Sequence, residues 1–318
     1  MNGKVKLLIG AVGLATVATG IYLGKKTLPE LSNYKRTTIP SALNTDSIFS
    51  CPHSDEQSLG WPLLEDRPES ITFVKAKNMK QAKQYAAKNL RIYNFDLGND
   101  LELANYVNEG LTNIYNKYKG KTPMPQNIAL DLNDKAEAYY DDKTDTLLFN
   151  SEGLSRLVTK KRVSDNIERI KKHPDAYGAI LTKLDEFTKN PNAFDRFDCL
   201  DLYDMIVDIE CLNHRKKFYP NDTYMEPGLT SGSKFGLVYH EYGHVLYYKI
   251  IGDSKRLKSL VADMEKSGTN NIRCKVSCYA SKNLHEFIAE TFRALMNGKK
   301  VPKDVMELYK KYNGPQMP

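Results

Sequence analysis

Two histidines four residues apart, with a glutamate between them, are the residues of this sequence best suited to chemistry. The segment 237–246 reads LVYHEYGHVL, and on a helix His240 and His244 share one face, about one turn apart. Both imidazoles can then meet a single metal ion, which is the mechanical meaning of H-E-x-x-H on a helix. Glu241 lies beside them, where it can reach a metal-activated water without binding the ion. The pattern therefore predicts a metal site with an adjacent general base.

A catalytic zinc site needs a third protein ligand, and the segment 276–296 offers two carboxylates. Asn283 is a suitable helix N-cap, which places Glu286 and Glu290 four residues apart on one helix face. Their neighbours are mostly apolar, so two carboxylates there are costly unless a positive charge faces them. A zinc ion held by the histidines is such a charge. His285 points about 100° away from Glu286 on a helix, which favours a packing or surface role.

The two segments together resemble the zinc peptidase domain of anthrax toxin lethal factor and its relatives, within the glutamate-zincin group. The resemblance lies in HEYGH followed by Y-x6-E-F-x-A-E-x-F, over roughly residues 232–297, and extends more loosely back to about residue 71. No sign of large toxin-delivery domains is visible, so the biology of a toxin does not carry over. The stretch from Gly153 to Tyr224 has no counterpart that we can place, and we interpret it as a helical insertion.

The resemblance also assigns a role to each residue of the paired motif. It implies one Zn²⁺ ion held by His240, His244 and Glu286. It implies that Glu241 is the general base, that the Tyr279 hydroxyl donates to the developing oxyanion, and that Glu290 accepts from the outer N–H of a histidine ligand. The implied activity is zinc-dependent endopeptidase action on a protein or peptide substrate.

The elements that must position these residues follow from the spacing of apolar residues. A strand is predicted at Ile71–Val74. Further β-prone runs and a hairpin loop are predicted at 128–132, 136–140 and 146–150, with the loop at 141–143. Helices are predicted at 79–90, 100–118, 151–190, 195–217, 232–251, 255–267 and 283–297, with a final short helix after Pro302. This order predicts an α+β fold, a zincin-like domain with a small mixed sheet, in which we expect Thr146 to Asn150 to be the edge strand that aligns a peptide.

The N-terminus carries the other strong signal. Leu7 to Gly24 is an uncharged apolar run flanked by lysines, so 1–27 is predicted to be a membrane anchor or a cleaved signal segment. Residues 28–70 have the composition of a linker, and 71–318 form the catalytic domain. We therefore expect a single-pass membrane-anchored or an exported protein.

Composition excludes several classes of protein. With 41% apolar and 27% charged residues, the chain has an ordinary globular balance, which excludes wholesale disorder. The 46 basic and 39 acidic residues give a net charge of +7, but they are interleaved, so no nucleic-acid partner is expected. Five cysteines are too few for a disulfide-built scaffold.

Each of three further features has both a structural and a functional interpretation. Cys274 and Cys278 could be buried thiols, a local disulfide, or part of a second zinc site. Cys51, in the linker beside His53, could in principle occupy the open metal position and keep the enzyme latent. A third feature is a stripe of aspartates that could be a solvated helix face with charges arranged to suit the helix dipole, or a wall that selects basic substrates. It comprises Asp195, Asp198, Asp201, Asp204 and Asp208.

Two other functions compete with the endopeptidase. A zinc-stabilised structural protein, of the kind met in phage head assembly, could carry the motif without turnover. The presence of Glu241 and Tyr279 speaks against it, because a structural zinc site needs neither a base nor an oxyanion donor. A hydrolase of cell-wall peptides would keep the same site and change only the cleft.

Overall fold

The computed structural model describes residues 67–131, 137–157, 160–173, 178–224 and 233–318. The membrane segment predicted over 1–27 and nearly all of the linker predicted over 28–70 lie outside these residues. Among the helices that are described, none combines the length and the apolar character needed to cross a membrane. Pro68–Pro318 falls within one compact unit, and the helical insertion predicted over 153–224 is part of it.

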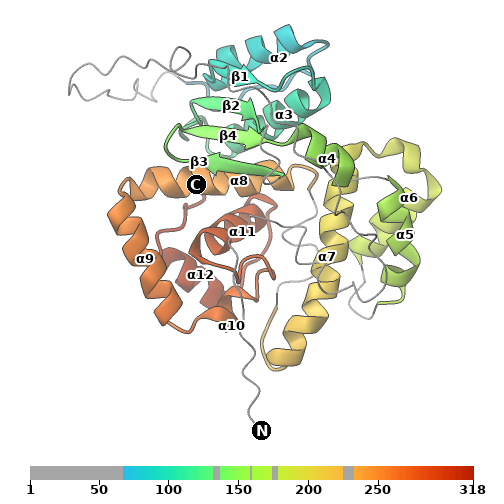
Figure 1. Ribbon diagram of the computed structural model, residues 1–318, viewed down its shortest axis with the longest axis vertical. Helices are drawn as coiled ribbons and strands as arrows, with labels where there is room; N and C mark the ends of the chain where they lie inside the picture. The colour runs from blue at the N-terminus through green and yellow to red at the C-terminus, as the bar shows by residue number, and fades with distance from the viewer. Residues whose placement is uncertain (1–66, 132–136, 158–159, 174–177, 225–232) are drawn as a thin grey trace, which may run out of the picture. The chain divides into compact units, whose positions relative to one another are not determined.

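A four-stranded mixed sheet with the order β1-β2-β4-β3 lies at the start of this unit (Figure 1). Its strands are β1 Asn94–Asp96, β2 Asn127–Leu130, β3 Ala138–Asp141 and β4 Thr146–Phe149. β4 pairs with β2 in parallel and with β3 in antiparallel orientation, so the predicted hairpin is present. The prediction that Thr146 to Asn150 is an edge strand is therefore wrong. Within the described part of the chain, the edge on this side of the sheet is β3, which pairs only with β4.

The strand predicted at Ile71–Val74 does not join the sheet, because side-chain amides of a helix bind its backbone instead. Asn116 accepts from the Ile71 N–H at 2.8 Å and donates to the Ile71 carbonyl at 2.9 Å. Asn105 makes the same pair of bonds with Ala76, at 2.7 and 3.0 Å. Each asparagine thus replaces the donor and acceptor that a neighbouring strand would offer.

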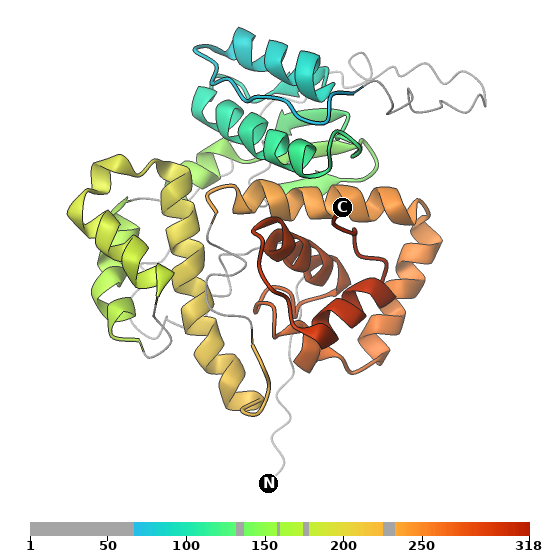
Figure 2. The ribbon, with the colours of Figure 1, turned by 180° about the vertical axis from the view of Figure 1, so that it is seen from behind.

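The helices at the start of the unit cover one face of the sheet, as Figure 2 shows for the longest of them. They are α2 Met79–Tyr85, its π-helical continuation η3 Ala86–Leu90, and α3 Leu101–Lys117. The predicted helices over 79–90 and 100–118 are confirmed. Strand β1, which lies between these helices in the sequence, was not predicted. It has three residues and one buried side chain, Phe95, which is too short a pattern to indicate a strand.

Two helices later in the chain carry the HEYGH motif and the segment after it. α8, Gly236–Ile251, runs beside the edge strand β3 and packs on α3 and on α11, Leu284–Met296 (Figure 1). The axes of α8 and α11 approach closely at Gly243 of α8, where a Cβ atom would lie 3.0 Å from the Cα atom of Ala289 in α11. A larger residue at Gly243 would separate the two helices that hold the motif residues.

The predicted insertion forms a group of helices that is packed into the same unit. Its members are α4 Ser151–Leu157, α5 Lys160–Lys171, α6 Ala179–Lys189, the short 3₁₀ helix η4 Pro191–Ala193 and α7 Arg196–Phe218. α7 contacts α5 and α6 on one side, and its Phe197 ring stacks on Tyr106 of α3, with ring centroids 3.6 Å apart. This helix therefore connects the insertion to the elements that surround the motif.

The C-terminal helices complete the unit around a second group of buried apolar side chains. They are α9 Ser254–Lys266, α10 Asn270–Arg273 and α12 Lys303–Lys311. This second core is formed with one side of α8 and α11, through residues such as Tyr247, Leu284 and Ile288. The described chain is thus an α+β protein with a small mixed sheet and many helices, as predicted.

Candidate metal centre

The predicted ligands come from the middle of α8 and the first turn of α11. Asn283 caps α11 by accepting from the Glu286 N–H at 3.0 Å, which fixes where that helix begins and where Glu286 points. His240 and His244 are one turn apart on α8. The predicted N-cap and the predicted helical spacing of the histidines are both confirmed.

The three side chains converge as a metal site requires. The Nε2 atoms of His240 and His244 lie 3.2 Å apart, and Glu286 Oε2 lies 3.1 Å from the first and 3.5 Å from the second. Ligand atoms at about 2.0–2.1 Å from one ion, at tetrahedral angles, lie about 3.3 Å from one another. His240, His244 and Glu286 can therefore hold a metal ion without rearranging.

Glu290 holds the outer nitrogen of His240. Its Oε1 atom lies 2.7 Å from His240 Nδ1, and its Oε2 atom accepts from the Ser277 hydroxyl at 2.8 Å. A carboxylate at this position accepts the Nδ1 proton, so the lone pair of Nε2 faces the other two ligands. The predicted role of Glu290 agrees with this geometry.

The electrostatics of the cluster favour a cation. Burial lowers the pKa of His240, but hydrogen bonds with Glu286 and Glu290 outweigh it and raise this pKa to about 10. Burial raises the pKa of the Glu286 and Glu290 carboxyls, but their hydrogen bonds with His240 outweigh it and hold both below the usual range. The buried carboxylate of Glu290 and the partly buried carboxylate of Glu286 thus stabilise positive charge at His240.

Glu241 lies beside the cluster, but unlike Glu286 and Glu290 it has a buried carboxylate oxygen without a hydrogen-bond partner among the described residues. Its side chain is buried, and the oxygen atom in question is Oε2. Burial raises its pKa above the usual range, whereas the two histidines act to lower it. A buried carboxylate oxygen without a partner is costly, and such atoms occur where a site receives water or a ligand.

Tyr279 lies beside His240, with the two ring centroids 5.5 Å apart. Burial and the nearby carboxylates of Glu286 and Glu241 raise the pKa of its hydroxyl, which keeps the proton needed by a hydrogen-bond donor. Lys282 places its Nζ atom 4.1 Å from the centre of the same ring. The structure therefore brings Tyr279 to the cluster, as the sequence predicted.

His285 is not part of the cluster. Its ring stacks on Tyr248 with centroids 5.4 Å apart, and burial lowers its pKa. Of the two predicted roles, surface or packing, the structure shows packing.

The cysteines of the described chain are free thiols. Cys274 donates to the Asn271 carbonyl at 3.1 Å, and the Cys211 and Cys278 thiols hydrogen-bond each other. The group of possible metal ligands found among the described residues contains no cysteine. Cys51 and the latency suggested for it lie outside those residues.

Both interpretations of the aspartate stripe on α7 need correction. Asp195 caps the helix by accepting from the Phe197 and Asp198 N–H groups, both at 2.9 Å. Asp201 binds Lys183 at 2.8 Å and Asp204 binds Arg293 at 2.7 Å. Most of the stripe caps the helix or forms ion pairs with other helices, so it is neither a freely solvated face nor an acidic wall. The charges do suit the helix dipole as predicted, with Asp198 in the first turn and basic residues in the last.

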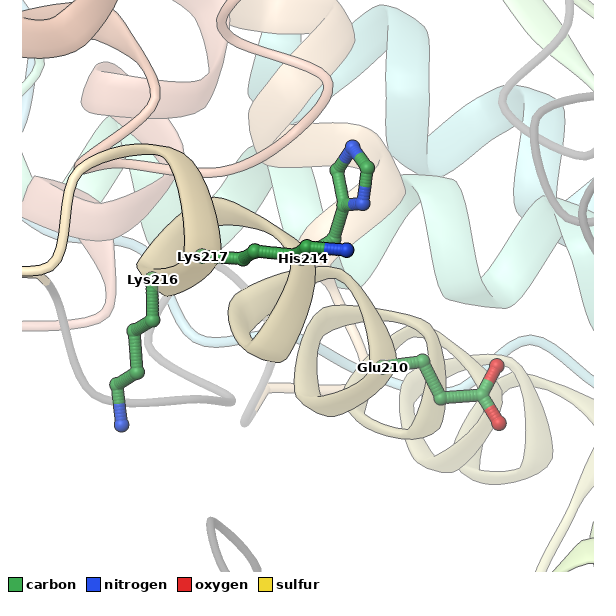
Figure 3. Close-up of a pocket in the computed structure, with 4 residues that line it drawn as sticks. All are labelled: Glu210, His214, Lys216 and Lys217. Carbon is green, nitrogen blue, oxygen red and sulfur yellow. The ribbon is translucent and has the colours of Figure 1, made fainter.

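A hollow of about 590 Å³ at the far end of α7 is a separate feature. It is lined by Glu210, His214, Lys216 and Lys217. Figure 3 shows Glu210 and Lys216 pointing away from each other, so these side chains do not converge on one ligand. It contains none of the metal-site residues.

Three polar residues near the cluster were not predicted. Arg293, with an Nη1 atom 3.7 Å from Glu290 Oε1, left one signal in the sequence, a basic residue inside the apolar face of a predicted helix. Ser277 reaches the site only through the fold, and no pattern in the sequence marks it. Asp204 belongs to the aspartate stripe, but nothing in the sequence indicates that it binds Arg293.

Comparison with protein-family models, with curated proteins and with solved structures found no match to this chain.

Proposed function

We propose that this protein is a zinc-dependent endopeptidase. The observation that carries the proposal is the convergence of His240, His244 and Glu286 on one point, with the unpartnered oxygen of Glu241 beside it. Two imidazole nitrogens and one carboxylate oxygen are a ligand set of catalytic zinc sites, in which a fourth position stays open for water. Structural zinc sites are closed by four protein ligands. The three-ligand set therefore favours an enzyme over a zinc-stabilised assembly protein.

The protein side chains divide the chemistry among them. When bound, the ion acidifies water and polarises the carbonyl group that is attacked. Glu241 takes the proton from the water and later gives it to the leaving amine, a role that suits a buried carboxyl with a raised pKa. Tyr279 donates its hydroxyl hydrogen to the carbonyl oxygen as negative charge develops there. Glu290 keeps His240 oriented throughout.

The substrate peptide is proposed to align on β3, in place of the strand predicted from the sequence. The Asn150 N–H donates to the Glu137 carbonyl at 2.9 Å, so alternate residues from Glu137 face β4. The backbone groups of Ala138 and Tyr140 then point to the open edge, where an extended peptide can add a strand. Strand addition favours a protein or peptide substrate over a small molecule. A hydrolase of cell-wall peptides keeps this geometry and is the second candidate within the same class.

The test uses the purified full-length chain, elemental analysis and cleavage of an unfolded protein such as casein. We expect one zinc per chain, cleavage that a chelator stops, and recovery when zinc is added back. Glu241→Gln should retain zinc and lose hydrolysis by about 10²–10⁴-fold, the usual contribution of a general base. Glu210→Gln, the same substitution in the hollow at the far end of α7, is the matched control and should cleave normally.

Two outcomes would contradict the proposal. A chain purified without zinc that still cleaves peptides would remove the metal from the reaction. A Glu241→Gln variant with wild-type rates would remove the base. Zinc binding that stabilises the fold without any cleavage would instead support the assembly protein.

We further propose that residues 1–27 anchor this enzyme to a membrane or direct its export. Alkaline extraction of membranes should leave an anchored chain in the pellet. A chain recovered outside the cell without these residues would indicate a cleaved signal.

A further inference from the structure

We infer that Asp204 of α7 and Arg293 of α11 are positioning residues for the metal ligand His240, so that the helical insertion is part of the metal centre. This inference rests on the proposed function only in that it requires the site to bind zinc. Neither side chain contacts the ligand atoms themselves. Their action is exerted through Glu290.

The contacts form a continuous chain from α7 to the cluster. Asp204 Oδ2 accepts from Arg293 Nη2 at 2.7 Å. Arg293 Nη1 lies 3.7 Å from Glu290 Oε1. The same Oε1 atom lies 2.7 Å from His240 Nδ1, and His240 Nε2 is one of the three convergent ligand atoms. Four side chains on three helices, Asp204 among them, thus form a chain that reaches the metal position.

The Oε1 atom of Glu290 lies near two groups that can donate to it, the imidazole of His240 and the guanidinium of Arg293, and the role of Asp204 follows from this. Oε1 is hydrogen-bonded to His240 and lies just beyond hydrogen-bond distance from the guanidinium of Arg293. Asp204 binds the other terminal nitrogen of that guanidinium, Nη2. Without the charge of Asp204, Arg293 is free to close on Oε1 and compete with His240 for it. The imidazole would then lose the bond that orients its Nε2 atom.

The location of Arg293 shows that its binding depends on these carboxylates. Its guanidinium lies against Gly236, the first residue of α8, where an added Cβ atom would lie 2.3 Å from Nη2. The N-terminus of a helix carries partial positive charge and disfavours a cation. Its side chain is also only 9% exposed, so water contributes little. Asp204 and Glu290 are therefore the main groups that hold the charge in this place, and Asp201 adds a smaller contribution from the same helix as Asp204.

The test measures the zinc dissociation constant of the metal-free full-length chain by competition with a chromophoric chelator. Asp204→Asn should weaken zinc binding by about 10–100-fold, the usual effect of losing a group that orients a ligand from outside the first coordination sphere. The visible absorption of the Co²⁺-loaded variant should differ from that of the wild type, because the orientation of His240 changes. A helix that merely packs would move neither quantity.

Two controls separate positioning from folding. Asp195→Ala removes the cap of the same helix, so it should lower the melting temperature and leave the zinc dissociation constant unchanged. In an Arg293→Met background, Asp204→Asn should have no further effect on zinc binding, because its action requires the guanidinium. Asp204→Glu keeps the charge and should bind zinc nearly as the wild type does.

The outcomes are distinguishable from those of the proposed function. A wild-type chain that binds no zinc overturns both. A wild-type chain that binds zinc, with Asp204→Asn binding equally well, overturns this inference alone. The same weakening by Asp204→Asn with and without Arg293 also overturns it, because Asp204 would then act by another route.

Discussion

Two helices of this protein carry carboxylates at helical spacing, and the two sets have different partners. On α11, Glu286 faces the histidines of α8 and Glu290 holds the outer nitrogen of one of them. On α7, Asp201 pairs with Lys183 of α6 and Asp204 pairs with Arg293 of α11. The carboxylates of α11 thus belong to a group that can hold a metal ion, whereas those of α7 form ion pairs with basic side chains of the same protein.

The two sets of carboxylates differ in whether the sequence reveals the positively charged group that each carboxylate binds. Glu286 has its partners in a motif whose chemistry is recognisable, because two histidines four apart imply a metal ion. Asp201 and Asp204 have partners 18 residues before and 89 residues after them, in segments with no motif. A buried carboxylate can therefore be inferred from the sequence only when its counter-charge can be inferred as well.

The largest effect that would test this comparison is expected at Glu286. Glu286→Gln keeps the size of the side chain but removes the charge that draws a cation to the histidines. Zinc affinity should fall by more than the 10–100-fold typical of groups outside the first coordination sphere, and cleavage should be lost with it. Competition with a chelator measures the affinity. Zinc binding at wild-type strength would show that α11 contributes no ligand.

A smaller effect is expected at Tyr279, which lies beside His240 and is proposed to donate to the oxyanion without binding the ion. Tyr279→Phe removes one oxyanion donor and should lower kcat by about 10²–10³-fold, the usual cost of such a loss. The zinc dissociation constant should not change, because the ring beside His240 is retained. Steady-state kinetics on a peptide substrate measure the rate. A normal kcat in this variant would show that the Tyr279 hydroxyl does not stabilise the oxyanion.

Most of the helices and the helical spacing of the motif residues were predictable because both depend on local patterns, whereas the choice of Glu286 as third ligand came from the family resemblance. Helical spacing placed His240 and His244 on one face, and Asn283 marked the start of α11 correctly. The strand predicted at Ile71–Val74 failed because Asn116 offers its backbone a donor and an acceptor that no propensity records.

Strand order was the other limit of prediction. The lengths of the β-prone runs do not say which strand pairs on both sides, so β4 was taken for the edge that β3 forms. The role of α7 was hidden for a related reason. Its contact with Arg293 joins residues 89 positions apart, and only the packed fold brings them together.

The smallest effect is expected at Asp201, three residues before Asp204 on the same helix. Its carboxylate is 3% exposed and binds Lys183 of α6 at 2.8 Å, on the side of the insertion. Asp201→Asn should lower the free energy of unfolding by about 1 kcal/mol, because Lys183 is one-third exposed and water screens the pair. The melting temperature should fall by about 2–4 °C in thermal unfolding followed by circular dichroism. Zinc affinity and cleavage should stay at wild-type values, since Asp201 is not in the chain of contacts that reaches His240. If Asp201→Asn weakened zinc binding as much as Asp204→Asn, the whole face of α7 would support the metal centre, and the distinction between the two aspartates would be lost.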